Sequence, residues 1–120
     1  MTAAATTAFR IDNYVVDVLL CDLVGHDRSP AAFLVYLLLW RRTRGTSLAS
    51  AKLSHRDIAD ETGLSKSAVQ QALRILHRRG LVKSKQQHMT DTPEHAVLRP
   101  WSREARRVGA WAGYKPRGDS

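Results

Sequence analysis

Cysteine and long apolar runs are the two features that this 120-residue sequence most clearly lacks. Its single cysteine, Cys21, cannot form a disulfide within the chain or supply a multi-cysteine zinc site. The longest apolar run spans residues 31–40, whereas a transmembrane helix needs about 20 residues. The first eight residues also lack the charged and apolar regions of a signal peptide. We therefore expect a cytoplasmic protein without a membrane-spanning segment.

Acidic side chains are also few, with 11 Asp and Glu against 19 Lys and Arg, which gives a formal net charge of +8. The excess lies in one part of the chain, because residues 1–40 carry a net charge of −2 and residues 41–120 a net charge of +10. A strongly basic region favours a polyanion such as nucleic acid, although a solvated basic surface without a target has the same composition. A membrane surface fits less well, since the basic residues do not lie opposite an apolar stripe on one helix.

Groups of residues that carry enzymatic or metal chemistry are missing as well. The sequence has no glycine-rich phosphate loop, no recognisable serine or cysteine nucleophile, and acidic residues too dispersed for a two-metal nuclease. We therefore expect no enzymatic activity, no cofactor and no metal, and we expect Cys21 to be a small buried hydrophobe. No histidine has metal-ligand spacing to another histidine or to Cys21. We expect the histidines to lie at the surface or to contact backbone: His26, His55, His77, His88 and His95.

Two apolar helices are predicted in the N-terminal third of the chain. Residues 14–24 carry apolar side chains at three- and four-residue intervals, with acidic residues such as Asp22 on the other side. Residues 31–42 follow Ser29 and Pro30, an N-cap and a first-turn proline, and are apolar almost all round through residue 40. A monomer of this size has difficulty covering both helices. We therefore expect either close packing between them or a homodimer that forms through them.

A second pair of helices, residues 56–61 and 66–79, is predicted to cross at a steep angle with a tight turn between them. Ser54 and Asp57 have the spacing of a capping box at the start of the first helix. The other local signals are a small residue where the helices touch, a turn residue that tolerates left-handed backbone, a second N-cap and a β-branched anchor: Ala59, Gly63, Ser65 and Val69.

A β-hairpin is predicted after the second helix of this pair. Residues 81–86 and 95–99 are two short extended stretches, and the turn-rich residues 87–94 separate them. Residues 51–53 have the composition of a further, very short strand.

The stretch from residue 53 to residue 82 resembles the winged helix-turn-helix families of bacteria. These include the MarR-like and GntR-like regulators and the DNA-binding modules of plasmid and phage replication initiators. Residues 76–82, Leu-His-Arg-Arg-Gly-Leu-Val, are similar to the usual exit from the recognition helix into the first wing strand. Counted over residues 29–100, the resemblance covers about 70 residues and includes the buried helix that precedes the pair.

The fold class that follows is mainly α with a small β-hairpin wing, a winged helix-turn-helix in a single domain. We expect residues 1–10 to be a flexible N-terminus and residues 11–100 to form the winged-helix domain with its N-terminal helix. Residues 101–120 form a basic C-terminal segment, in which we expect Trp101 to close the core and the last dozen residues to be a flexible arm that follows the phosphate backbone or a minor groove.

The resemblance implies a sequence-specific protein that binds double-stranded DNA, a transcriptional regulator located at the nucleoid. A plasmid or phage replication or partition factor would use the same binding mode. A winged-helix adaptor that binds protein is the alternative from another class, although its interaction face would carry exposed apolar anchors. A ligand-responsive regulator would have to bind its effector near the apolar helices.

The predicted DNA contacts come from the two helices of the pair and from the wing. Gln70 and Gln71 suit bidentate contact with adenine, and Lys66 and Arg74 suit guanine or phosphate. Short hydroxyls and side chains near helix N-termini would orient the protein on the DNA backbone: Ser65, Ser67, His55 and Arg56. Lys83 and Lys85 alternate onto one face of the first wing strand, where they either meet phosphates or keep a solvent-facing edge soluble.

Overall fold

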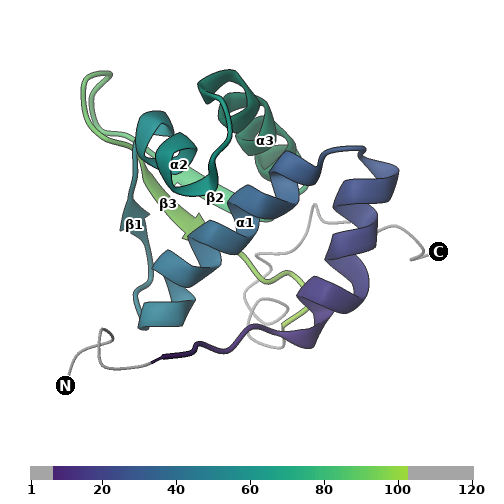
Figure 1. Ribbon diagram of the computed structural model, residues 1–120. Helices are drawn as coiled ribbons and strands as arrows, with labels where there is room; N and C mark the ends of the chain where they lie inside the picture. Colours follow the sequence, from purple (N-terminus) through teal and green to yellow (C-terminus); the bar gives the residue numbers. More distant parts are fainter. Residues whose placement is uncertain (1–6, 103–120) are drawn as a thin grey trace.

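The structure is a computed structural model that describes residues 7–102, and it is mostly helical with a small antiparallel sheet (Figure 1). An N-terminal helix spans residues 13–26. The elements after it are α1 (Pro30–Arg42), a 3₁₀ turn (Arg44–Thr46), β1 (Ala51–Lys52), α2 (His55–Thr62), α3 (Lys66–Arg78), β2 (Val82–Lys85) and β3 (Glu94–Val97). In the sheet, β3 lies between β1 and β2. This is the winged helix-turn-helix fold that the sequence predicts, with the β2–β3 hairpin as its wing.

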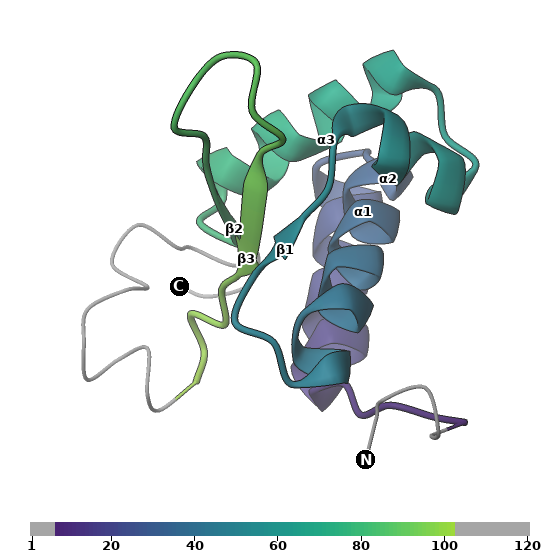
Figure 2. The same cartoon turned by 90° about the vertical axis from the view of Figure 1, so that its left-hand side faces the viewer.

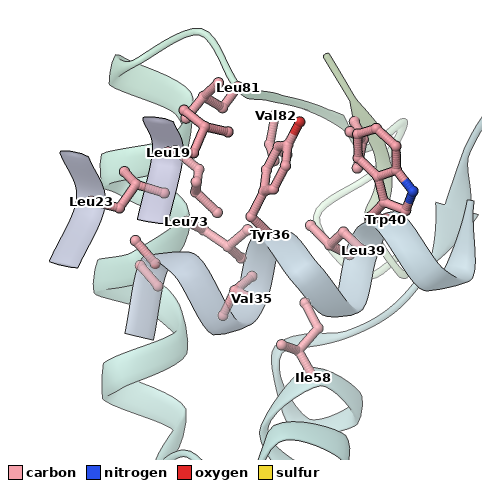
Figure 3. Close-up of a cluster of buried hydrophobic side chains, with 14 of the residues drawn as sticks. Leu19, Leu23, Val35, Tyr36, Leu39, Trp40, Ile58, Leu73, Leu81 and Val82 are labelled. Carbon is pink, nitrogen blue, oxygen red and sulfur yellow. The ribbon is translucent and has the colours of Figure 1, made fainter. Parts of the chain in front are cut away.

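Helix α1 forms the centre of the hydrophobic core (Figure 3). Its side chains Val35, Tyr36 and Leu39 are fully buried, and the helix packs against α3, α2, β3 and the N-terminal helix. The polar groups of two buried aromatic side chains donate hydrogen bonds to backbone carbonyls. The Tyr36 hydroxyl donates to Leu98 O at 2.9 Å, and Trp40 Nε1 donates to Arg10 O at 2.8 Å. Burial raises the pKa of Tyr36, so this hydroxyl stays protonated and keeps its role as a donor. The prediction of a helix buried on most faces is confirmed.

The N-terminal helix buries a narrower face than the sequence analysis predicts. It contains two π-helical stretches, Val15–Leu19 and Asp22–His26, and in the second the Asp27 N–H donates to Asp22 O at 3.0 Å. Val15, Leu19 and Leu23 are fully buried, as predicted for this helix. The predicted burial is wrong for three other residues of this helix. Val16 and Leu20 are 53% and 37% exposed, and Cys21 is also exposed.

The prediction that Asp22 lies on the solvent side of this helix is also wrong, because its side chain is buried. Val15 and Asp22 are both buried, so the two side chains lie on the side of this helix that faces the core. The preference of a carboxylate for water favoured the opposite prediction. Arg79, from another part of the chain, pairs with Asp22 and makes its burial possible.

The wing strands are shorter than predicted, and the hairpin is part of a three-stranded sheet. β2 and β3 pair in antiparallel register from Val82 with Val97 to Lys85 with Glu94. β1 pairs with the other edge of β3, so the very short strand that the sequence suggests exists over two residues. Glu94, which the prediction assigns to the wing tip, therefore belongs to the central strand.

The chain beyond the sheet returns to the start of the N-terminal helix. Trp101 stacks on Tyr14 with their ring centroids 4.5 Å apart, and its Nε1 donates to Asp12 Oδ2 at 3.0 Å. Arg99 bonds the same carboxylate at 3.0 Å. Trp101 packs against the core, as predicted. The basic arm predicted after it lies outside the described residues, as do residues 1–6 of the segment predicted to be a flexible N-terminus.

Candidate nucleic-acid interface

Helix α2 begins with the capping box that the sequence predicts. The Ser54 hydroxyl accepts a hydrogen bond from Asp57 N at 3.0 Å, and Asp57 Oδ2 accepts one from Ser54 N at 3.0 Å. These two hydrogen bonds lower the pKa of the Asp57 carboxyl, which stays ionised at the positive end of the helix dipole. The helix starts at His55, one residue earlier than predicted. Its first turn thus presents His55 and Arg56 beside the cap.

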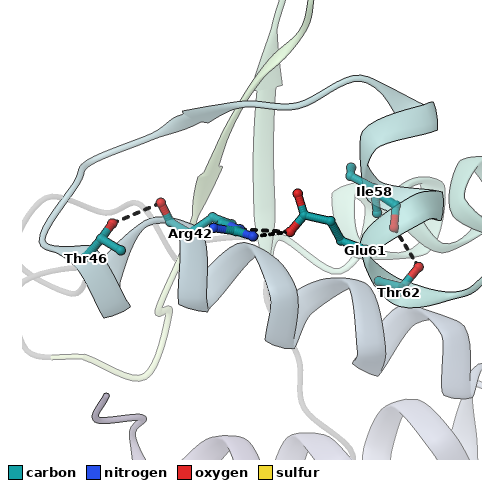
Figure 4. A network of polar contacts seen from close by, with 5 residues as sticks. All are labelled: Arg42, Thr46, Ile58, Glu61 and Thr62. Carbon is teal, nitrogen blue, oxygen red and sulfur yellow. Dashed lines mark hydrogen bonds and ion pairs between the residues drawn. The ribbon is translucent and has the colours of Figure 1, made fainter. Parts of the chain in front are cut away.

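The turn between α2 and α3 depends on Gly63. Its φ of +80° lies in the left-handed region, and its N–H donates to Ala59 O at 2.9 Å to close the end of α2. A Cβ at this position would have no neighbour within 4 Å, so the glycine is needed for its backbone conformation rather than for space. The Thr62 hydroxyl donates to Ile58 O at 2.7 Å in the same last turn (Figure 4). Ser65 then caps α3 by accepting from Ala68 N at 3.1 Å.

Helix α3 has one buried face and one exposed polar face. Val69, Ala72, Leu73 and Leu76 are buried in the core. The cap and the outward positions of the N-terminal half are all exposed: Ser65, Lys66, Ser67, Gln70, Gln71 and Arg74. The structure therefore brings the predicted contacts of this helix onto a single free face. Of the two predicted contacts on α2, Arg56 is exposed and His55 is half-buried.

The wing lies at the same end of the molecule as α3, while the C-terminal end of α1 lies at the opposite end (Figure 2). Lys83 and Lys85 on β2 are both exposed, as predicted. Lys83 pairs in register with Ala96, whereas Lys85 pairs with Glu94, which also has Lys52 as its partner on β1. A hydrogen bond from Ser50 is the main cause that lowers the pKa of Glu94, and Lys85 and Lys52 lower it further. The charge of Lys85 is thus partly compensated within the sheet, and that of Lys83 has no acidic partner across the strand pair.

A family model, the Crp-like helix-turn-helix domain, matches residues 31–98, which is more than half of the chain. The chain belongs to the Crp-like helix-turn-helix family. The match runs from α1 to the end of the wing and confirms the predicted membership of a bacterial helix-turn-helix family that binds DNA. It does not extend to the narrower resemblance to MarR-like, GntR-like or replication-initiator proteins. Comparisons with curated proteins and with solved structures find no match.

The Crp-like domain is joined to the N-terminal helix by an ion pair at the end of α3. Arg79, the C-cap residue of α3, bonds Asp22 through its Nη2 atom, and Asp27 Oδ2 lies 3.6 Å from its Nε atom. The Asp22 side chain is 1% exposed and that of Arg79 14% exposed. Gly80 follows with a φ of +70° and directs the chain into the wing. The sequence does not predict this pair, because its partners lie 57 residues apart and no local pattern links them.

The Crp-like domain also contains a buried histidine. His95 on the central strand β3 is 1% exposed, and both of its ring nitrogens have partners. Its Nδ1 lies 2.6 Å from Ser84 Oγ and its Nε2 lies 2.9 Å from Leu53 O. The Ser84 hydroxyl also lies 2.8 Å from His77 Nε2 on α3. The contact of His95 with the Leu53 carbonyl agrees with the prediction that the histidines lie at the surface or contact backbone. The ring itself is buried, because β3 is the central strand of the sheet and His95 lies on its covered face.

Within residues 7–102, no group of three or more His, Cys, Asp or Glu side chains is arranged to hold a metal ion. No helix in this part of the chain is long and apolar enough to cross a membrane. The Crp-like fold is that of a DNA-binding module rather than of an enzyme, and its exposed polar helix is the feature from which a function can be argued.

Proposed function

We propose that the chain is a sequence-specific transcriptional regulator that binds double-stranded DNA through α3 and the wing and acts at the nucleoid in the cytoplasm. The observation that carries this proposal is the two-sided character of α3. One face fixes the helix in the core, and the other presents exposed amide, hydroxyl and cationic side chains without any large apolar residue. A protein-binding adaptor would need apolar or aromatic anchors on this face.

The proposed contacts divide into base recognition and backbone positioning. Gln70, Gln71 and Arg74 read base edges in the major groove, where glutamine matches adenine and arginine matches guanine. The remaining residues contact phosphates and fix the register of the helix: His55, Arg56, Ser65, Lys66, Ser67, Lys83 and Lys85. The Ser65 side chain accepts only from Ala68 N, so other N–H groups of the first turn of α3 are available to a phosphate.

Substitutions on α3 and on the wing should separate these two roles. Gln71→Ala or Arg74→Ala should relax the preference for one base position by about 1–3 kcal/mol, because a bidentate contact is lost. Lys83→Ala should weaken binding to all sequences alike, because a phosphate contact carries no sequence information. Selection from random oligonucleotides, followed by competition binding, measures both effects. Identical behaviour of the three variants would contradict the placement of α3 in the groove.

We further propose that the chain binds DNA as a homodimer formed through the N-terminal helix. Val16 and Leu20 are separated by one helical turn and are 53% and 37% exposed, which leaves an apolar strip on this helix outside the core. Helix α1 has a single large apolar side chain that is exposed, Leu34 at 42%, whereas the N-terminal helix has two that lie one turn apart, so we place the dimer contact on the N-terminal helix. A twofold dimer would read half-sites about 34 Å apart on the DNA.

Charges placed on this strip should separate the dimer. We expect Val16→Asp combined with Leu20→Asp to give a monomer by sedimentation equilibrium, because two buried carboxylates without partners would face each other across the interface. Leu48→Asp is the matched control, since Leu48 is 56% exposed but lies in the loop before β1. A wild-type chain that sediments as a monomer over the whole concentration range would overturn the proposal.

A further inference from the structure

Four groups from four parts of the fold form a continuous chain of hydrogen bonds that runs from the exposed His77 to the buried His95. His77 lies near the end of α3, Ser84 in the middle of β2 and His95 in β3, and Leu53 precedes the cap of α2. The Ser84 hydroxyl is the central member, with His77 Nε2 at 2.8 Å and His95 Nδ1 at 2.6 Å. His95 Nε2 completes the chain at 2.9 Å from Leu53 O. We call these four residues the wing relay.

The direction of each hydrogen bond follows from the acceptor at one end. A backbone carbonyl can only accept, so His95 Nε2 carries a proton and donates to Leu53 O. In a neutral imidazole the other nitrogen is then an acceptor, so the Ser84 hydroxyl donates to His95 Nδ1. The same hydroxyl oxygen accepts from His77 Nε2. With both imidazoles neutral, every donor in the wing relay has an acceptor.

We propose that Ser84 and His95 are positioning residues that fix the wing against α3, and that this connection is weakened when both imidazoles of the relay are protonated. The part that concerns DNA affinity rests on the proposed function, because it requires the wing to contact phosphates. The part that concerns the wing relay itself does not.

Protonation affects the wing relay through His95. A proton on His77 Nδ1 leaves the Nε2–H donor unchanged. A proton on His95 Nδ1 makes that atom a donor, so the Ser84 hydroxyl must turn toward His77, which has to become the other neutral tautomer. When both rings are charged, both nitrogens donate to one oxygen and the hydroxyl proton has no acceptor in the relay. The two cations also repel each other across that oxygen.

The surroundings of the two rings oppose this doubly charged state. Burial lowers the pKa of His95, and the charges of His77 and His55 lower it further against the opposing effect of the Leu53 carbonyl. Burial also lowers the pKa of His77, and His55 adds to this effect. Glu94, the acidic residue next to His95, is paired in register with Lys52 and Lys85 and bonded to Ser50.

The sign of the pH dependence follows from these shifts. The unfolded chain takes up protons at both histidines as the pH falls through about 6.5, while the folded chain takes them up only at lower pH. These groups therefore contribute stability that is present above about pH 6.5 and is lost as the pH falls toward the lowered pKa values. We expect this dependence to be weaker in Ser84→Ala, where the rings no longer depend on each other through the hydroxyl.

Imidazole nitrogen NMR on the free protein tests the wing relay directly. We expect His77 and His95 to be Nε2–H tautomers at neutral pH, and the Ser84→Ala variant to change the titration of both rings and to speed amide exchange in β2 and β3. Ser84→Thr keeps the hydroxyl and should restore the wild-type pattern, while Thr90→Ala, which removes an exposed hydroxyl from the tip of the same hairpin, should leave it unchanged. An Nδ1–H tautomer at His95, or unchanged titrations in Ser84→Ala, would overturn the relay.

A double-mutant cycle on DNA tests the positioning role. Ser84→Ala alone should weaken binding by about three- to tenfold, the equivalent of one lost hydrogen bond. Lys83→Ala should then cost less in the Ser84→Ala background than in the wild type, because a displaced wing no longer brings Lys83 to its phosphate. Additive effects would contradict positioning. A chain that binds no duplex would refute the proposed function, and the NMR result would still decide the relay.

Discussion

Replacing Asp22 with alanine should lower the free energy of unfolding by about 3–5 kcal/mol, because it leaves the charge of Arg79 partly buried without its main partner. The Asp22 side chain is 1% exposed and Arg79 14% exposed, so water replaces little of the lost interaction. Asp27, whose Oδ2 lies 3.6 Å from Arg79 Nε, compensates only in part. Chemical denaturation followed by circular dichroism measures the change.

The exposed pair Arg42–Glu61 is the matched control (Figure 4). Its side chains are 45% and 33% exposed, so Glu61→Gln should cost less than about 1 kcal/mol. The double variant Asp22→Leu with Arg79→Met should recover only part of the stability, because an apolar pair avoids the cost of removing these two charges from water but leaves the Asp27 carboxylate, which is 11% exposed, without Arg79. An Asp22→Ala variant that loses no more stability than Glu61→Gln would show that the pair does not hold the N-terminal helix to α3.

The position of Arg79 gives this ion pair a consequence for DNA binding. Arg79 is the C-cap residue of α3, and Gly80 and Leu81 lead from it directly into the wing. The family match begins at residue 31, after the N-terminal helix, yet this helix holds the end of the recognition helix through Asp22. The helix that carries the proposed dimer contact is thereby connected to the helix that carries the proposed DNA contacts.

The helix-turn-helix could be predicted from the sequence because its determinants are local. The Ser54 capping box, the left-handed Gly63 and the Ser65 cap each act within three or four residues of the chain. Their residue types are those that such backbone positions require. The exposed positions of α3 follow from helical periodicity once Val69 is placed in the core. The family match and the structure agree with the sequence analysis over this region.

The features that sequence analysis missed depend on partners far away in the chain. Asp22 is buried because Arg79 meets it, and His95 is buried because β1 pairs with β3 and makes it a central strand. No sequence pattern near Asp22 or His95 indicates these distant partners. The cost of removing a carboxylate or an imidazole from water also favours a prediction that both side chains are exposed. Cys21 was misplaced for a related reason, since the apolar character of a side chain does not specify which face of a helix is covered.

Raising the salt concentration should weaken binding to duplex DNA by two or more orders of magnitude. The proposed interface contains five exposed cations: Arg56, Lys66, Arg74, Lys83 and Lys85. If four or five of them neutralise phosphates, the released counterions give a fall of about 150- to 500-fold in affinity per chain between about 50 and 200 mM salt. Fluorescence anisotropy with a short labelled duplex measures the slope of log affinity against log salt concentration.

Single variants assign that slope to individual side chains. Lys83→Ala should reduce its magnitude by about 1, because one phosphate contact is lost, whereas Gln71→Ala should leave the slope unchanged and lower affinity only for the preferred sequence. Lys85→Ala should reduce the slope by less than Lys83→Ala, because Glu94 lies opposite Lys85 in the sheet and already compensates part of its charge. Equal reductions for the two lysines would show that this compensation does not persist on DNA, and a slope near zero would exclude phosphate contact by this face.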